Sequence, residues 1–371
     1  MTDPGAAIAP QRLKNLLRQM IDIYSPSGKE VELLEFLHRY LKRFGLPVHR
    51  QEVDDRRYNL LVMPATEDPQ LVLIGHVDTV AAYDLDRYAA EEEGDQIRGL
   101  GAADMKGGCA AMVEAFAAAF HQDGAPLPAA LALVVGEEEE GDGAQRLVEE
   151  YHFPWAVIGE PTDLGPCLSH SGYLEIQVRT RGRRRHASLA SRQENAVELM
   201  LHVMLEMTRY LEERRPDVVY NIRDLFSSQA GFAVPDRCEA WLDLHLPPAA
   251  PVGEIATDLE EIFSGYCRTH PSGEGIFRLS TVDAGYELPE KGPVVESLQD
   301  IYRSRGIKWN AEVFRSHSDA NRIWAAGIKP ILLGPGRLEM AHVPEESVSF
   351  AQVCDAAEIY FAMIKSLPRF Y

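Results

Sequence analysis

The residues of the chain best suited to chemistry are His76 and Asp78, which lie in the stretch Gly75–Val80 directly after the apolar run 71–74. A short apolar run that gives way to polar residues predicts a buried strand ending near the histidine. In open α/β sheets, functional side chains collect at the carboxyl ends of strands. A histidine there can bind a metal through one ring nitrogen while a carboxylate holds the other nitrogen. An isolated pair of this kind also occurs as a structural hydrogen bond, so its meaning depends on the rest of the chain.

Three later segments repeat the pattern of an apolar run followed by polar ligand-type residues. The acids 137–140 follow the run 131–135, Glu160 follows 155–158, and His342 comes after 330–333. Four adjacent acids at the end of a buried strand repel one another, so they are either solvated or neutralised by cations. These segments predict that several ligand-type side chains meet at one edge of a sheet.

A further acid, Asp104, lies in a glycine-rich segment, 99–108, that leads into an alanine-rich helical run. The glycines allow the chain to turn sharply before the helix. In isolation Asp104 could equally be the N-cap of that helix.

Together the five segments supply imidazoles and carboxylates but no thiolates. Such ligands are typical of zinc, cobalt or manganese in a catalytic site. Two histidines and three shared carboxylates exceed the needs of one ion and suit two ions about 3.5–4 Å apart, bridged by one carboxylate. One acid is then left over, and hydrolysis requires an acid as general base. The sequence therefore predicts a two-metal hydrolytic site.

These segments, in this order, resemble the co-catalytic zinc hydrolases that include acetylornithine deacetylase, succinyl-diaminopimelate desuccinylase, aminoacylase and bacterial glutamate carboxypeptidase. The resemblance covers nearly the whole chain, from Ser25-Pro26-Ser27-Gly28 to the helix after His342. It implies two divalent metal ions, expected to be zinc, with cobalt or manganese as alternatives. The implied ligands of one ion are His76 and Glu160, those of the other are Glu138 and His342, and Asp104 bridges both.

The resemblance also assigns the remaining site residues. It implies that Asp78 supports His76 and that Glu137 is the general base; the spacing from Glu138 to Gly143 selects this pair among the four acids. The peptide bond after the bridging aspartate is expected to be cis. One departure is Gly136, which stands where an aspartate often precedes the catalytic pair.

Composition limits the class of protein. With 371 residues, the chain exceeds the roughly 250–300 residues at which single cores stop growing, so two domains are expected. A hydrophobic content of 46% is that of a soluble globular protein. The net charge of −20 argues against nucleic acid or an anionic membrane as a partner. Five widely spaced cysteines, and an N-terminus without the features of a signal peptide, predict a cytoplasmic protein.

The order of the predicted elements separates the two domains. Residues 11–170 alternate helical and strand-like patterns, which predicts an α/β domain with a largely parallel sheet. Residues 172–285 instead read strand-helix-strand-strand-helix-strand, the ferredoxin-like order. We therefore expect a catalytic domain of residues 1–171 and 286–371. An α+β domain of residues 172–285 is inserted in it and, by the resemblance, serves as a lid and dimerisation domain.

The inserted domain contains the basic segment 181–185 followed by His186. The plain interpretation is a solvated turn. The resemblance instead implies that His186 stabilises the oxyanion, reaching into the partner subunit's active site in a homodimer. Elsewhere in the chain, Ser318, Asn321 and Gly334 are candidate substrate contacts, and Ser318 or Asp319 could alternatively cap a helix.

Three functions remain open at this stage. The first is a metal-dependent hydrolase that cleaves the amide bond of an N-acyl amino acid, as a deacetylase or desuccinylase does. The second is a carboxypeptidase or dipeptidase that releases a free amino acid from a short peptide. The third, a non-catalytic binding protein, is disfavoured because the base and every implied ligand are present. The residues do not separate the first two, since both reactions break an amide next to a carboxylate.

Overall fold

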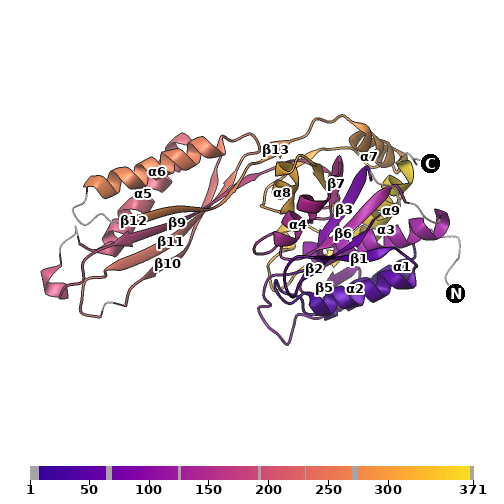
Figure 1. The fold of residues 1–371 in the computed structure, drawn as a ribbon, viewed down its shortest axis with the longest axis horizontal. Coiled ribbons are helices and arrows are strands. Elements are labelled where there is room, and N and C mark those ends of the chain that lie inside the picture. The colour runs from indigo at the N-terminus through magenta and orange to yellow at the C-terminus, as the bar shows by residue number, and fades with distance from the viewer. Residues whose placement is uncertain are drawn as a thin grey trace. The chain divides into compact units, whose positions relative to one another are not determined.

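The computed structural model describes residues 8–63, 69–123, 127–190, 194–229, 231–269 and 275–367. The chain divides into two compact units (Figure 1). Unit 1 comprises residues 1–168, 288–314 and 318–371, and unit 2 comprises residues 169–287 and 315–317. Within the described residues, no helix is both long enough and apolar enough to cross a membrane.

The centre of unit 1 is a set of four parallel strands in the order β6-β3-β7-β15. Their residues are almost entirely buried, in keeping with the continuous apolar runs of the sequence, because a parallel sheet is covered on both faces. The predicted largely parallel α/β sheet is confirmed. The strands are β3 (Leu71–His76), β6 (Ala129–Val134), β7 (Trp155–Ile158) and β15 (Lys329–Leu332).

Antiparallel strands extend this sheet at both sides. The hairpin partners β1 (Val48–Glu52) and β2 (Tyr58–Val62) join it next to β6. On the other side, β8 (Cys167–His170) runs antiparallel to β15 and also pairs with β14 (Glu312–Phe314). The two-residue strand β13 (Tyr286–Glu287) pairs with the last residues of β8.

Helices cover the sheet of unit 1. The alanine-rich helix α3 is buried from residue 107 to 119 and packs against α9 and α1, because its small side chains allow close approach. The helices are α1 (Pro10–Asp22), α2 (Val31–Arg43), α3 (Gly107–Asp123), α4 (Asp142–Glu150), α7 (Pro293–Ser304), α8 (Asp319–Ala325) and α9 (Phe350–Ser366).

A small second sheet in unit 1 has no counterpart in the predicted elements. It pairs β4 (Glu91–Glu93) with β5 (Gln96–Arg98), and β5 with β16 (Ser347–Ser349). Each strand has three residues, and those of β4 are exposed glutamates, so neither length nor hydrophobic alternation indicates a strand. This sheet matters for the site because β16 closely follows His342.

Unit 2 has the predicted order of strands and helices. Its antiparallel sheet has the order β10-β11-β9-β12, and α5 and α6 pack on it over a core of aliphatic side chains and methionines. Strand β10 lies at an edge of this sheet. The elements are β9 (Gly172–Arg181), α5 (Ala196–Arg214), β10 (Val219–Ser227), β11 (Arg237–Leu246), α6 (Val252–Thr269) and β12 (Gly275–Asp283).

Candidate metal centre

Three neighbouring parallel strands bring the first ligand-type residues together. His76 is the last residue of β3, Glu137 and Glu138 follow β6, and Glu160 follows β7. Because β6, β3 and β7 are adjacent and parallel, their carboxyl ends lie side by side at one edge of the sheet. The predicted gathering of ligands at a sheet edge is therefore present within unit 1.

Asp104 reaches this edge from an irregular segment rather than from a helix cap. It lies in a short π-helical turn, Ala102–Lys106, that precedes α3, and its backbone is extended, with φ −119° and ψ 97°. Gly101, in the left-handed region at φ 76°, provides the turn into this segment. The bond between Asp104 and Met105 is cis, as the resemblance implied.

The two oxygens of the Asp104 carboxylate face two different histidines. His76 Nε2 lies 3.1 Å from Oδ1, and His342 Nε2 lies 3.4 Å from Oδ2. His342 Nε2 also lies 2.8 Å from Glu138 Oε2, and His76 Nε2 lies 4.0 Å from Glu160 Oε1. One carboxylate thus stands between two groups of ligand-type side chains.

These groups have the size that a metal ion requires. Ligand atoms of His76, Asp104 and Glu160 lie within 4.8 Å of one another, and so do those of Asp104, Glu138 and His342. The two sets share Asp104 and correspond to the two ligand sets that the resemblance implies. A third set joins His76 and Glu138 with Glu137. Glu137 Oε2 is 3.9 Å from His76 Nε2, so this acid stands beside the ligands.

The charges and unpaired atoms of the site fit divalent cations. Glu160 Oε1 is buried without a hydrogen-bond partner. Burial raises the pKa of Glu137 and of Glu160 well above the ordinary value, and burial together with the charge of Asp104 raises the pKa of Glu138. Bound cations would reverse this penalty by compensating the crowded carboxylates. The nearest thiol belongs to Cys109, which donates to the His76 carbonyl oxygen, and burial raises its pKa to about 12.

Neighbouring carboxylates raise the pKa of both histidines. The hydrogen bond with Glu138 raises the pKa of His342 to about 9. Burial alone would lower the pKa of His76, but hydrogen bonds with Asp104 and Asp78 raise it well above the ordinary value. A metal ligand must be a neutral imidazole, so metal binding at this site displaces protons.

The Asp78 carboxylate contacts His76 and also the backbone of Glu137 and Glu138. Its carboxylate accepts hydrogen bonds from the backbone amides of Glu137 and Glu138, at 3.2 and 3.0 Å, and from the Ser27 hydroxyl at 2.7 Å. The other neighbour is His76, whose Nδ1 lies 3.5 Å from Asp78 Oδ1 and 3.1 Å from the Asp78 carbonyl oxygen. One buried side chain therefore holds a candidate ligand and the candidate base together.

The glycine that departs from the family pattern has a structural reason. Gly136 has φ 75°, and a Cβ added there would collide with the Asp142 carboxylate and approach Arg57 Nη1 to 2.9 Å. Arg57 pairs with Asp142 at the start of α4 and with Asp54. An ion pair thus occupies the space in which a side chain at position 136 would lie.

Two acids near the ligands were not assigned to the centre from the sequence. Asp319 is buried at the start of α8, its pKa is raised by burial to about 7, and its charge raises the pKa of Glu137 and Glu160. Glu346 is buried beside the Asp104 segment, and burial raises its pKa to about 7. The sequence pattern indicates Asp319 only as a possible helix cap, and Glu346 lies outside the five segments that supply ligand-type residues.

The candidate substrate contacts have structural partners. The Ser318 side chain accepts from the Ala320 amide, and Asn321 completes a capping box at the start of α8, which is the alternative left open for Ser318. Gly334 packs so closely on the backbone of Gly159 and Glu160 that a Cβ would collide with it. A role for these three residues in substrate binding stays a prediction.

His186 lies in unit 2, whereas the candidate metal ligands lie in unit 1. It is exposed at the start of a short 3₁₀ turn, and its Nδ1 lies 2.7 Å from Ser188 Oγ. Its role as a donor to the oxyanion stays a prediction.

Comparisons with known proteins find a family and relatives that match most of the chain. The family described as peptidase family M20/M25/M40 matches residues 72–366. An acetylornithine deacetylase from Edwardsiella ictaluri is 27% identical over 336 residues, 85% of this chain and 86% of the relative. One from Photorhabdus laumondii is 26% identical over 376 residues, 94% of this chain and 95% of the relative. A tripeptidase structure from Staphylococcus aureus has a TM-score of 0.81 at 22% identity, covering 97% and 99% of the two chains.

Proposed function

The chain belongs to peptidase family M20/M25/M40, and from this we propose that it is a metal-dependent hydrolase that cleaves the amide bond of N-acyl amino acids. The observation that supports this most strongly is the Asp104 carboxylate, with one oxygen toward His76 and the other toward His342. Relatives of similar length that bear the name acetylornithine deacetylase support an N-acyl amino acid as substrate. The peptidase structures share the fold at lower identity, so cleavage of a peptide is the alternative outcome of the test.

We assign the metal ligands by the two sets that share Asp104. His76 and Glu160 would hold one ion, Glu138 and His342 the other, and Asp104 would bridge them. Zinc is the proposed ion, because imidazole and carboxylate ligands in an open catalytic site suit it, and cobalt or manganese can use the same ligands.

The chemistry depends on one acid beside these ligands. Two bound divalent ions would polarise the scissile carbonyl and lower the pKa of a water molecule to about 7. Glu137 would take a proton from the attacking water and return it to the leaving nitrogen, serving first as base and then as acid. Asp78 would keep Glu137 in place through the backbone amides of the catalytic pair.

A homodimer is part of the proposal, with His186 as donor to the oxyanion in the partner's site. Its support lies in unit 2, where the edge strand β10 exposes large apolar side chains. Val219 is 67% and Phe226 63% exposed, and Ile222 and Leu225 are also exposed on this strand. An exposed apolar edge strand is a surface for pairing with another chain, and a second copy would cover it.

A cytoplasmic location is also proposed, because the five cysteines are free, in keeping with a reducing cytoplasm.

The test is a substrate panel with a matched inactive variant. Metal-loaded enzyme should release free amino acid from N-acetyl or N-succinyl amino acids faster than from dipeptides. The Glu137→Gln variant should hydrolyse each of these substrates far more slowly than the wild type. Hydrolysis of dipeptides alone would instead assign the peptidase activity. Failure of the loaded enzyme on every amide of the panel would overturn the proposal.

A further inference from the structure

The buried carboxylate of Glu346, which lies in the His342 segment, forms hydrogen bonds with the distant segment that contains Asp104. Glu346 is only 4% exposed, and it follows the candidate ligand His342 by four positions. Its Oε1 accepts hydrogen bonds from the backbone amides of Ala103 and Asp104, at 2.9 and 3.0 Å. Its Oε2 accepts from the Gly101 amide at 2.9 Å. Three amides of the turn that presents Asp104 thus end on one side chain.

The backbone places this carboxylate through strand pairing. Strand β16 begins directly after Glu346 and pairs with β5, with Ser347 opposite Arg98. The Glu346 carbonyl oxygen accepts from the Gly99 amide at 3.1 Å, and the Glu346 amide donates to the Val343 carbonyl oxygen at 3.1 Å. The small sheet therefore sets the position from which the side chain enters the Asp104 turn.

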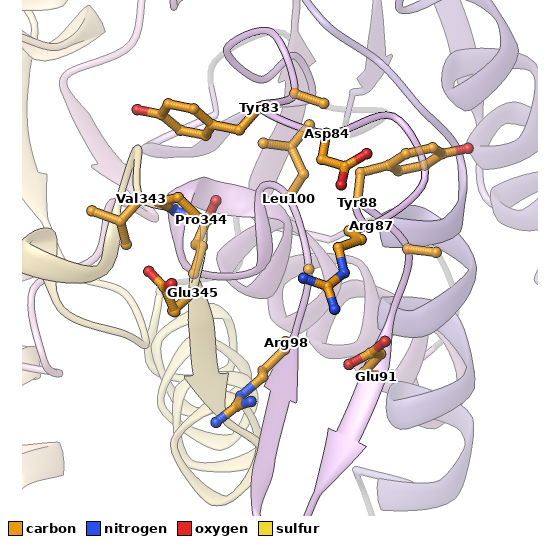
Figure 2. Close-up of a pocket in the computed structure, with 14 residues that line it drawn as sticks. Tyr83, Asp84, Arg87, Tyr88, Glu91, Arg98, Leu100, Val343, Pro344 and Glu345 are labelled. Atoms are coloured by element: carbon orange, nitrogen blue, oxygen red, sulfur yellow. The ribbon is translucent and has the colours of Figure 1, made fainter.

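The backbone of His342 has a hydrogen bond of its own, which does not involve Glu346. His342 has a left-handed backbone, with φ 58°, and its carbonyl oxygen accepts from the Tyr83 hydroxyl at 2.9 Å. Tyr83 and Glu346 both line a cavity of about 320 Å³ in unit 1, together with Val343 and Glu345. Figure 2 shows Tyr83, Val343 and Glu345 around this cavity. Glu345 is exposed there and has no role in the Asp104 turn, so it offers a control for Glu346.

We propose that Glu346 is a positioning residue that fixes the Asp104 turn against the His342 segment and thereby sets the affinity of the centre for metal. The proposal rests on the proposed function only in that Asp104 and His342 bind metal. Successive backbone amides that converge on one point form a concave site for an anion, and here the side chain of Glu346 is the anion. Without it, three amides of the turn lose their acceptor, and the bridging carboxylate loses its fixed orientation.

Two substitutions remove the same charge but different numbers of hydrogen bonds. In Glu346→Gln, the amide oxygen can still accept from Ala103 and Asp104, but the amide nitrogen faces the Gly101 donor. In Glu346→Ala, all three acceptor contacts are lost. Residues that orient metal ligands typically change metal affinity by about 10–100-fold when replaced, so we expect the glutamine variant near the lower end of this range and the alanine variant near the upper end.

The experiment measures metal binding directly and without substrate. Metal-free enzyme is titrated with zinc against a chelating indicator, and with cobalt while the visible absorption of the bound ion is recorded. The wild type, Glu346→Gln, Glu346→Ala and the control Glu345→Gln are compared well below their melting temperatures. We expect weaker binding and an altered cobalt spectrum in the Glu346 variants, and wild-type behaviour in Glu345→Gln.

The outcomes distinguish this proposal from the proposed function. If the wild type binds metal and Glu346→Gln binds it with the same affinity and spectrum, the positioning role is wrong while the function stands. Equal losses in Glu346→Gln and Glu345→Gln would also overturn it, because they would reflect only the removal of a nearby charge. If Glu346→Ala does not fold, the glutamine variant alone decides. A wild type that binds no metal would overturn both proposals.

Discussion

Replacing Asp78 by asparagine keeps the shape of the side chain but should weaken its contacts with His76 and with the amides of Glu137 and Glu138. In the structure, both oxygens of Asp78 accept, Oδ1 from the Glu137 amide and Oδ2 from the Glu138 amide and the Ser27 hydroxyl. Asparagine keeps one acceptor oxygen, so its amide nitrogen must face one of the two backbone donors. The variant also removes the negative charge beside His76 Nδ1.

The magnitude follows from these contacts. One buried donor without an acceptor costs about 1–3 kcal/mol. At roughly 2–4 °C per kcal/mol for a domain of this size, the melting temperature should fall by roughly 2–12 °C. Loss of the partner that orients His76 should lower metal affinity and kcat/KM by about 10–100-fold.

The assay compares Asp78→Asn with Ser27→Ala. The control removes one donor to Asp78 but leaves an acceptor for both backbone amides, so it should have the smaller effect on all three quantities. Melting temperature, metal affinity and kcat/KM are measured on the same preparations. If Asp78→Asn matched the wild type in metal affinity and kcat/KM, or if Ser27→Ala caused an equal loss, Asp78 would not act through its contacts with the Glu137 and Glu138 amides and His76.

Four further predictions follow from the site. Glu137→Gln should lower turnover at least roughly a hundredfold with metal content retained, which activity and elemental analysis together check; near-full activity would assign the base to another acid. Mixing Glu137→Gln with His186→Ala should restore part of the activity in verified heterodimers, and no recovery would exclude action across the dimer. Gly136→Ala should lower the melting temperature and turnover, because the new methyl group displaces the Asp142–Arg57 ion pair; a wild-type melting curve would contradict this. Metal binding should tighten as pH rises from about 6.5 toward 9, because the raised pKa of His342, about 9, keeps it protonated in metal-free enzyme; a competition titration that shows no pH dependence would count against His342 as a ligand.

The same raised pKa has the opposite effect on the metal-free protein. A group whose pKa is higher in the folded state adds stability below its unfolded pKa and loses it as pH rises through the folded value. The His342 contribution should therefore be present below about pH 6.5 and disappear by about pH 9. Since the side chain is half-exposed, this contribution is small.

The sequence predicted the parts of the centre that follow from strand order. The apolar runs before His76, Glu137 and Glu160 are adjacent parallel strands, so residues that end them meet at one edge. A hydrophobic run of four to six residues is a strong local signal, and the position of a polar residue at its end is simple to infer. The family resemblance then supplied roles that spacing alone leaves open.

The parts that could not be predicted depend on contacts between distant segments. Glu346 bonds backbone amides more than 240 positions earlier, and an amide donor leaves no trace in the sequence. Gly136 is explained by its left-handed backbone and by the ion pair that fills its neighbourhood. Asp104 lies just before α3, as expected, but nothing in the sequence indicated that its backbone is extended or that its amide donates to Glu346.

Hydrolysis at this site should depend on metal held by Asp104 and its neighbours. This dependence is tested by removing metal from the enzyme with a strong chelator and adding zinc or cobalt back in measured equivalents while following amide hydrolysis of an N-acyl amino acid. We predict that the metal-free enzyme is inactive, that activity returns as metal is added, and that binding saturates at two ions per chain. Full activity in protein that contains no transition metal by elemental analysis would contradict the account.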